Sequence, residues 1–195
     1  MKSKIKVAVL AGGISNEREV SLKTAAQIAK ALPKDKYQVM VVEIPKDENK
    51  VLGVLAKIPK INVAFIALHG RFGEDGKIQA ILDLLKIPYT GSGVLASALG
   101  MDKVKCSNIL QNVGTLIPKF ITLNNPKEID PSLKKIEKEI GYPCVVKPNE
   151  SGSSLGVTVV KNKNKITLKK ILLRGNDIKV YFNELIKIIR NGKIS

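Results

Sequence analysis

The chain has 195 residues, of which 44% are hydrophobic, and a mean hydropathy of +0.03, so it can bury the core of one large domain or two small ones. No run approaches the roughly 18–20 apolar residues of a membrane span, and Gly12-Gly13 comes before an apolar signal core of adequate length, so we expect a cytoplasmic protein with no membrane partner. The two cysteines, Cys106 and Cys144, are too few for a disulfide framework and lack metal-ligand spacing.

The net charge of +16 is unevenly distributed and has to be weighed as a sign of nucleic-acid binding. Residues 157–195 hold ten Lys and Arg and two Asp and Glu, a net charge of +8, and the preceding 156 residues hold 23 and 15, also +8. Lysine dominates, aromatic residues make up 4% of the chain, and no RNA-recognition signature or Cys/His finger is present. A solvated lysine-rich surface explains the charge better, so no nucleic-acid partner is expected.

The first part of the chain alternates between strand and helix patterns. Short apolar or β-branched runs predict strands, and apolar residues at helical spacing, ended in the first case by a proline, predict helices. The strands are expected at 5–10, 37–44 and 62–68, and the helices at 21–32 and from about residue 77, with a weak helix before the third strand. Such alternation implies right-handed crossovers and a mostly parallel, doubly wound α/β sheet.

Turn residues at 88–93 precede a second group of elements. One helical segment is predicted from 94 to 110, with a domain boundary near its start, and an amphipathic helix is predicted around 132–140. The strands expected at 144–147 and 157–160 are joined by a Ser/Gly loop. They would form a hairpin whose tip can fold over a ligand.

Two loops of the first part are candidate sites, because ligands on parallel sheets bind beyond the carboxyl ends of the strands. Glu17 lies between the first strand and its helix, where it could cap the helix or face a substrate ammonium. His69, the only histidine, ends the third strand and could be structural or functional. In the following loop, Glu74 and Asp75 could form turns or, with weaker support, bind a metal.

A third candidate site is the stretch VVKPNESGSSLGV at 145–157. Lys147 ends a strand, and the Ser/Gly run after it supplies amides and hydroxyls that could wrap a polyphosphate. Such a run could also be a plain linker. The flanking strands favour a phosphate flap, although the pattern is not that of a P-loop.

Several stretches, taken together, resemble the D-alanine–D-alanine ligase family of the ATP-grasp superfamily. They are GGISNEREVSL at 12–22, HGRFGEDGKIQAILDLLKIPYTGSG at 69–93, SALGMDKVKC at 97–106 and VVKPNESGSSLGV at 145–157. Their order and spacing across residues 1 to about 160 make the resemblance far more specific than any single stretch.

The resemblance implies roles for individual residues in binding the substrates. Glu17 is expected beside the amino group of the first D-alanine and His69 beside its carboxylate region, with Val20 and Ser21 as further substrate-binding residues. Ser153 resembles the serine that connects to that glutamate through a tyrosine and helps to place the second D-alanine. Glu17 and Ser153 are thus the expected catalytic residues.

The resemblance also implies an ATP site. Two lysines are expected to reach the phosphates, and serines and glycines of the loop are expected to close over them. The expected ATP-binding residues are Lys103, Lys147, Ser151, Gly152, Ser154 and Gly156. The cofactors implied are ATP and Mg²⁺ (or Mn²⁺), and the metal ligands belong to a part of the family pattern that finds no match here, so no metal ligand is expected on this chain.

The expected organisation is an N-terminal α/β substrate domain at 1–96, the start of an ATP-grasp domain at 97–160, and an unmatched basic tail at 161–195. By resemblance the activity is ATP-dependent joining of two D-alanines through an acyl phosphate, for peptidoglycan precursors. The alternatives are a ligase that makes D-alanyl-D-lactate or another mixed product, and a truncated, non-catalytic remnant. Expected partners are D-alanine and ATP, with a homodimer as the candidate assembly. Because the later family motifs find no match, the chain alone is not expected to turn over.

Overall fold

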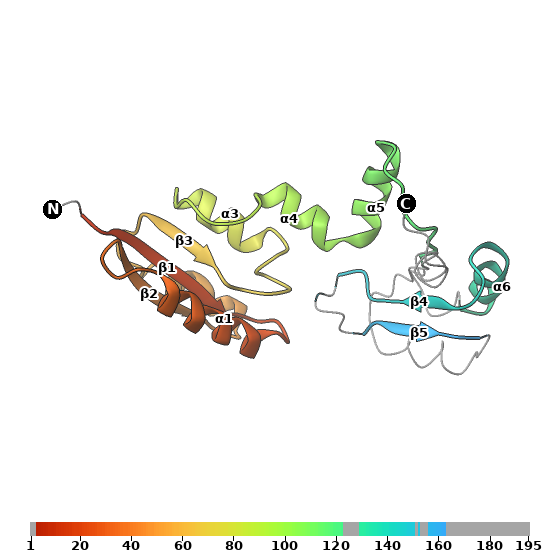
Figure 1. Ribbon diagram of the computed structural model, residues 1–195, viewed down its shortest axis with the longest axis horizontal. Coiled ribbons are helices and arrows are strands. Elements are labelled where there is room, and N and C mark those ends of the chain that lie inside the picture. Colours follow the sequence, from red (N-terminus) through yellow and green to blue (C-terminus); the bar gives the residue numbers. More distant parts are fainter. Residues whose placement is uncertain (1–2, 123–128, 151, 153–155, 163–195) are drawn as a thin grey trace. The chain divides into compact units, whose positions relative to one another are not determined.

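The computed structural model describes residues 3–122, 129–150, 152 and 156–162 (Figure 1). The chain forms two compact units, Met1–Met101 and Asp102–Ser195, which are described separately. The division thus falls after Met101, whereas the sequence placed the expected boundary after residue 96. No helix among the described residues is long and apolar enough to cross a membrane.

The first unit is built on a three-stranded parallel sheet (Figure 1). Its strands are β1 (Ile5–Gly12), β2 (Tyr37–Ile44) and β3 (Val63–Ile66), in the order β2-β1-β3. Val7 of the central strand is in register with Val39 on one side and Val63 on the other. The parallel sheet predicted from the sequence is therefore confirmed.

Five helical segments accompany this sheet. They are α1 (Arg18–Ala31), the 3₁₀ turn η1 (Glu48–Lys50), α2 (Val51–Leu55), α3 (Lys77–Leu84) and α4 (Val94–Met101). The first helix begins at Arg18, three residues before the predicted start, since its first turn is polar and carries no apolar periodicity. It ends before Pro33, whose missing amide cannot continue a helix.

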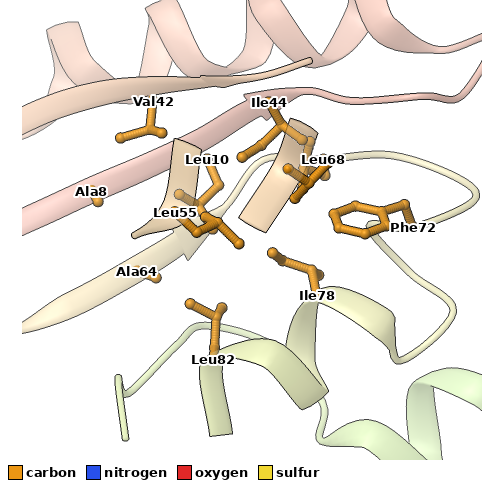
Figure 2. Close-up of a cluster of buried hydrophobic side chains, with 11 residues drawn as sticks. Ala8, Leu10, Val42, Ile44, Leu55, Ala64, Leu68, Phe72, Ile78 and Leu82 are labelled. Atoms are coloured by element: carbon orange, nitrogen blue, oxygen red, sulfur yellow. The ribbon is translucent and has the colours of Figure 1, made fainter. Parts of the chain in front are cut away.

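The central strand is buried on both faces, as its unbroken apolar run predicts. Val7 and Val9 face a cluster that includes Ala25 of α1. Ala8 and Leu10 face the opposite cluster, which α2 and α3 complete (Figure 2). That larger cluster comprises Ala8, Leu10, Val42, Ile44, Val51, Leu55, Ala64, Leu68, Phe72, Ile78 and Leu82. Helices on both faces make the sheet doubly wound, in agreement with the predicted fold class.

The second unit contains two helices and a two-stranded antiparallel sheet among its described residues. These elements are α5 (Lys103–Asn112), α6 (Ile129–Glu139), β4 (Cys144–Val146) and β5 (Thr158–Val160). The two strands pair antiparallel, with Cys144 opposite Val160, as expected of the strands of a hairpin. Cys144 is fully buried, and its burial raises the pKa of the thiol to about 12.

One predicted helix is in fact two. The sequence indicated a continuous segment from 94 to 110, but α4 ends at Met101 and α5 begins at Lys103. Asp102 between them has an extended backbone (φ −86°, ψ 94°), and its side chain accepts a hydrogen bond from the amide of Lys105 at 3.0 Å. The prediction was wrong here because Asp102 is an N-cap that starts a new helix rather than an interior residue.

Candidate functional site

The first group of candidate residues lies at the carboxyl ends of β1 and β3. The loop after β1 leads into α1 on one face of the sheet, whereas the loop after β3 leads into α3 on the other face. Adjacent parallel strands whose connections leave in opposite directions define the switch point at which open α/β sheets bind ligands. Glu17 and His69 belong to these two loops.

Ser15 joins the two loops through its hydroxyl. Its Oγ donates a hydrogen bond to the carbonyl oxygen of His69 at 2.7 Å and accepts one from the amide of Glu17 at 3.1 Å. The two predicted substrate residues are therefore held by the same side chain. The sequence pattern alone indicates no function for Ser15, although a serine that accepts a hydrogen bond from the amide two residues later is a known turn pattern.

Glu17 is 8% exposed and occupies the N-cap position of α1. Its side chain makes no capping hydrogen bond to the helix, so the capping alternative does not describe its carboxylate. A Cβ atom placed on Gly70 would lie 2.7 Å from Glu17 Oε2, and Gly70 has a φ of +68°. The carboxylate therefore packs against backbone that only glycine can supply.

The ring of His69 lies between α1 and the loop after β3. Its Nε2 is 3.4 Å from Thr24 Oγ1, and its Nδ1 is 3.9 Å from Glu74 Oε1. The other carboxylate oxygen of Glu74 accepts a hydrogen bond from the amide of Gly70 at 2.8 Å. Glu74 thus fixes the backbone next to His69 and lies within ion-pair distance of the ring.

Glu74 and Asp75 form the turns of their loop, as one of the two interpretations predicted. Asp75 accepts hydrogen bonds from the amide of Phe72 at 2.9 Å and from the amide of Lys77 at 3.2 Å. Within the part of the chain that the structure describes, no three His, Cys, Asp or Glu side chains gather as a metal site would require. These contacts support the turn-forming interpretation over the metal-binding one.

Ser21 connects the ends of β1 and β3 from within α1. Its buried Oγ accepts a hydrogen bond from the amide of Gly12 at 2.9 Å and donates one to the carbonyl oxygen of Ala67 at 2.6 Å. These contacts give Ser21 a structural function, and its substrate contact stays a prediction. Its neighbour Val20 is 55% exposed.

The second group of candidates, in the second unit, centres on two lysines. Lys103 is the first residue of α5, and Lys147 follows β4. The pKa of Lys103 is lowered from its usual 10.5, first by burial and then by the positive charge of Lys147, against the opposing effects of Asp102 and Glu150. Burial also lowers the pKa of Lys147. Two partly buried ammonium groups that repel each other are suited to binding an anion between them.

The predicted flap is described only in part. Ser151, Ser153 and Ser154 lie outside the described residues, and Gly152 is half-buried. Gly156 has a φ of +76°, and a Cβ atom there would lie 2.8 Å from Cγ of Pro148. The two ends of the loop therefore pack closely beside Lys147, and Gly156 has a structural reason to be glycine.

Comparison with known proteins identifies the family. The family model described as D-ala D-ala ligase N-terminus matches residues 6–58 and 46–92, and the one described as D-ala D-ala ligase C-terminus matches residues 109–189. A D-alanine–D-alanine ligase of Geobacter sulfurreducens is 43% identical over 161 residues, which are 83% of this chain and 48% of the relative. The chain belongs to the D-alanine–D-alanine ligase family, and it spans about half the length of the curated relatives it matches.

Solved structures agree with this assignment. The crystal structure of D-alanine–D-alanine ligase from Bacillus anthracis complexed with ATP matches with a TM-score of 0.75 and 32% identity, over 94% of this chain and 57% of that one. The VanG D-Ala:D-Ser ligase from Enterococcus faecalis matches with a TM-score of 0.74 and 26% identity, over 93% and 63%. The C-terminal family match runs to residue 189, so it includes most of the stretch at 161–195 that the sequence left unmatched.

Proposed function

We propose that the chain carries the first-substrate site and the phosphate-binding lysines of an ATP-dependent D-alanine–D-alanine ligase. The observation that carries the proposal is the buried carboxylate of Glu17, which packs against Gly70 at the switch point of the sheet. A carboxylate there can pair with the ammonium group of a small amino acid. Family membership supports D-alanine as that amino acid.

In this proposal the first unit orients D-alanine. Glu17 receives its ammonium group, and His69 lies beside its carboxylate, with Thr24 and Glu74 fixing the direction of the imidazole ring. Ser15 keeps the two groups at a constant separation, because it bonds to the backbone of both. Such fixed positions raise the rate by orienting a reactant rather than by direct chemistry.

The lysines of the second unit bind the phosphates of ATP. The γ-phosphoryl group passes to a carboxylate oxygen of the first D-alanine, which yields ADP and an acyl phosphate. The amine of the second D-alanine then attacks the acyl carbon, loses a proton and displaces phosphate. Lys103 and Lys147 stabilise the negative charge of the phosphates, and the loop that contains Ser151, Ser153 and Ser154 excludes water. Mg²⁺ would supply further charge stabilisation when bound.

The identity of the second substrate has a serious alternative. The VanG match is to a D-Ala:D-Ser ligase, so a second substrate other than D-alanine, such as D-serine or D-lactate, is the alternative. We favour D-alanine because the curated relatives at 43–44% identity are named for that product. A cytoplasmic role in supplying peptidoglycan precursors, and assembly as a homodimer, belong to the same proposal.

The test is ligand binding by the 195-residue chain, measured calorimetrically. We expect Lys147→Ala to weaken ATP binding roughly tenfold or more, as the loss of a charge-assisted contact to phosphate would. Lys119→Ala, which removes an exposed lysine of the same unit, is the matched control and should change affinity less than about twofold. Equal effects of the two substitutions would argue against the phosphate role.

D-alanine binding and phosphate release complete the test. Glu17→Gln keeps the shape of the side chain and removes its charge, so it should abolish D-alanine binding and leave ATP binding intact. The ligase step itself is measured as D-alanine-dependent release of phosphate from ATP. Binding of ATP without any effect of D-alanine would favour the non-catalytic alternative.

A further inference from the structure

The N-terminus of α5 is capped from outside the helix. The first four amides of a helix have no partner within it. In α5, Asp102 is the N-cap: its Oδ1 accepts a hydrogen bond from the amide of Lys105 at 3.0 Å, and its carbonyl oxygen accepts the first bond within the helix, from the amide of Cys106 at 2.9 Å. The amides of Lys103 and Val104, the first two residues of the helix, point to Asn149, which is 45 residues away from Val104 in the sequence.

Asn149 receives three donors from two successive residues. Its Oδ1 accepts a hydrogen bond from the amide of Val104 at 3.0 Å. Its carbonyl oxygen accepts one from Lys103 Nζ at 2.8 Å and a longer one from the Lys103 amide at 3.4 Å. The residue is fully buried, and its Nδ2 has no hydrogen-bond partner among the described residues. Buried side-chain amides usually have all of their donors bonded, so the unused Nδ2 donor of Asn149 calls for an explanation other than stability.

We propose that Asn149 is a positioning residue: its side chain holds the first turn of α5 through the Val104 amide, so that its backbone carbonyl receives Lys103 Nζ in a direction suited to phosphate binding. The lack of charge on that side chain is part of this function. The inference rests on the proposed ATP-binding role of Lys103 and Lys147. Asn149 lies two residues after Lys147, so its bonds to Lys103 connect Lys103 to the turn that follows Lys147. A lysine side chain has four rotatable bonds, and holding Nζ in place reduces the freedom that would be lost on binding phosphate.

Neutrality distinguishes asparagine from its closest substitute. Aspartate at this position would keep an oxygen acceptor for the Val104 amide and would remove the unused donor. It would also place a carboxylate beside the ammonium group of Lys103, which Asp102 and Glu150 already affect electrostatically. The added negative charge would compete with phosphate for Lys103. A purely structural role would therefore tolerate aspartate, whereas a phosphate-positioning role would not.

The first experiment needs no ligand. Amide hydrogen exchange of the 195-residue chain reports the bond from Val104, and NMR titration of the Lys103 Cε signal reports its ammonium group. In Asn149→Ala we expect exchange at Val104 to accelerate roughly tenfold or more, because its amide loses its acceptor. In Asn149→Asp exchange should stay as in the wild type, and the pKa of Lys103 should rise. Asn108→Ala, at an exposed position of α5, is the control and should change neither signal.

The second experiment is titration with ATP. Both variants keep the backbone carbonyl that accepts Lys103 Nζ. We expect Asn149→Ala to weaken binding roughly tenfold or more because the first turn of α5 loses its side-chain anchor, and Asn149→Asp to weaken it similarly through its added charge, although aspartate keeps the helix cap. Wild-type affinity in Asn149→Asp, or unchanged Val104 exchange in Asn149→Ala, would overturn the inference. If the wild-type chain failed to bind ATP while the exchange results held, the proposed function would fall and the positioning of Lys103 by Asn149 would stand.

Discussion

Removing the hydroxyl of Ser21 should destabilise the first unit strongly. Ser21→Ala would leave the amide of Gly12 and the carbonyl oxygen of Ala67 without their partner, and the position is fully buried, so water cannot replace the hydroxyl. A buried polar group without a partner costs about 1–3 kcal/mol, so we expect a loss of about 3 kcal/mol for the pair. For a unit of this size that is a drop of roughly 10–20 °C in Tm.

The matched control is Ser97→Ala. Ser97 Oγ also donates to a backbone carbonyl oxygen, that of Ser92 at 3.2 Å, but this hydrogen bond is exposed, so water can take its place. Its loss should change the unfolding free energy by less than about 0.5 kcal/mol. Thermal and urea unfolding followed by far-ultraviolet circular dichroism would measure both variants. If Ser21→Ala were no more destabilising than Ser97→Ala, the structural function assigned to Ser21 would be refuted.

Three further predictions concern the candidate sites. Gly70→Ala forces a φ of +68° on alanine, which costs about 1–2 kcal/mol, and places its Cβ 2.7 Å from Glu17 Oε2. Titration with D-alanine should therefore show that binding is lost, and wild-type affinity would contradict this prediction. Burial and Lys147 lower the pKa of Lys103, so its positive charge is present below that pKa and lost above it. As pH is raised, ATP affinity should therefore begin to decrease at a lower pH than it would with a lysine of ordinary pKa. The same depression means that stability should rise with pH between the lowered pKa and 10.5. In the folded chain iodoacetamide should modify half-buried Cys106 and spare Cys144, whose thiol pKa is about 12; equal labelling by mass spectrometry would show that the β4–β5 pair opens.

Much of the fold could be predicted because its signals are local. The apolar run of β1 indicated a strand buried on both faces, and Pro33 marked the end of α1. The break at Asp102 was missed because both flanking segments have helical patterns, and a cap is visible only once the backbone at that residue is known. The family match at 161–189 was not predicted, because this lysine- and asparagine-rich segment contains no short motif that can be aligned by inspection.

The candidate residues, too, include some that local sequence signals predict and others that only the fold reveals. Glu17, His69, Lys103 and Lys147 are chemically conspicuous residues next to strand or helix ends, and the sequence identified all of them as candidates. Ser15 bonds to the carbonyl of His69, 54 residues away, and Asn149 bonds to Val104 across 45 residues. Serine and asparagine are common turn residues, so nothing local distinguishes these two. Only the fold, which brings distant backbone groups together, reveals what they hold.

The neutral residues explain how the charged ones could function. A charged group contributes most to binding or catalysis when it is already oriented before the ligand arrives. If it has to reorient during binding, the free-energy cost of that reorientation offsets its favourable interaction with the ligand. Ser15 holds the backbone of Glu17 against that of His69, and the Asn149 side chain holds the amide of Val104 while its backbone carbonyl accepts the ammonium group of Lys103. Both anchors bond to backbone or to the charged group without adding a charge of their own, so the field at each site is set by the functional residue. Substitutions that keep the size of the anchor but add a charge should therefore impair ligand binding more than they impair stability.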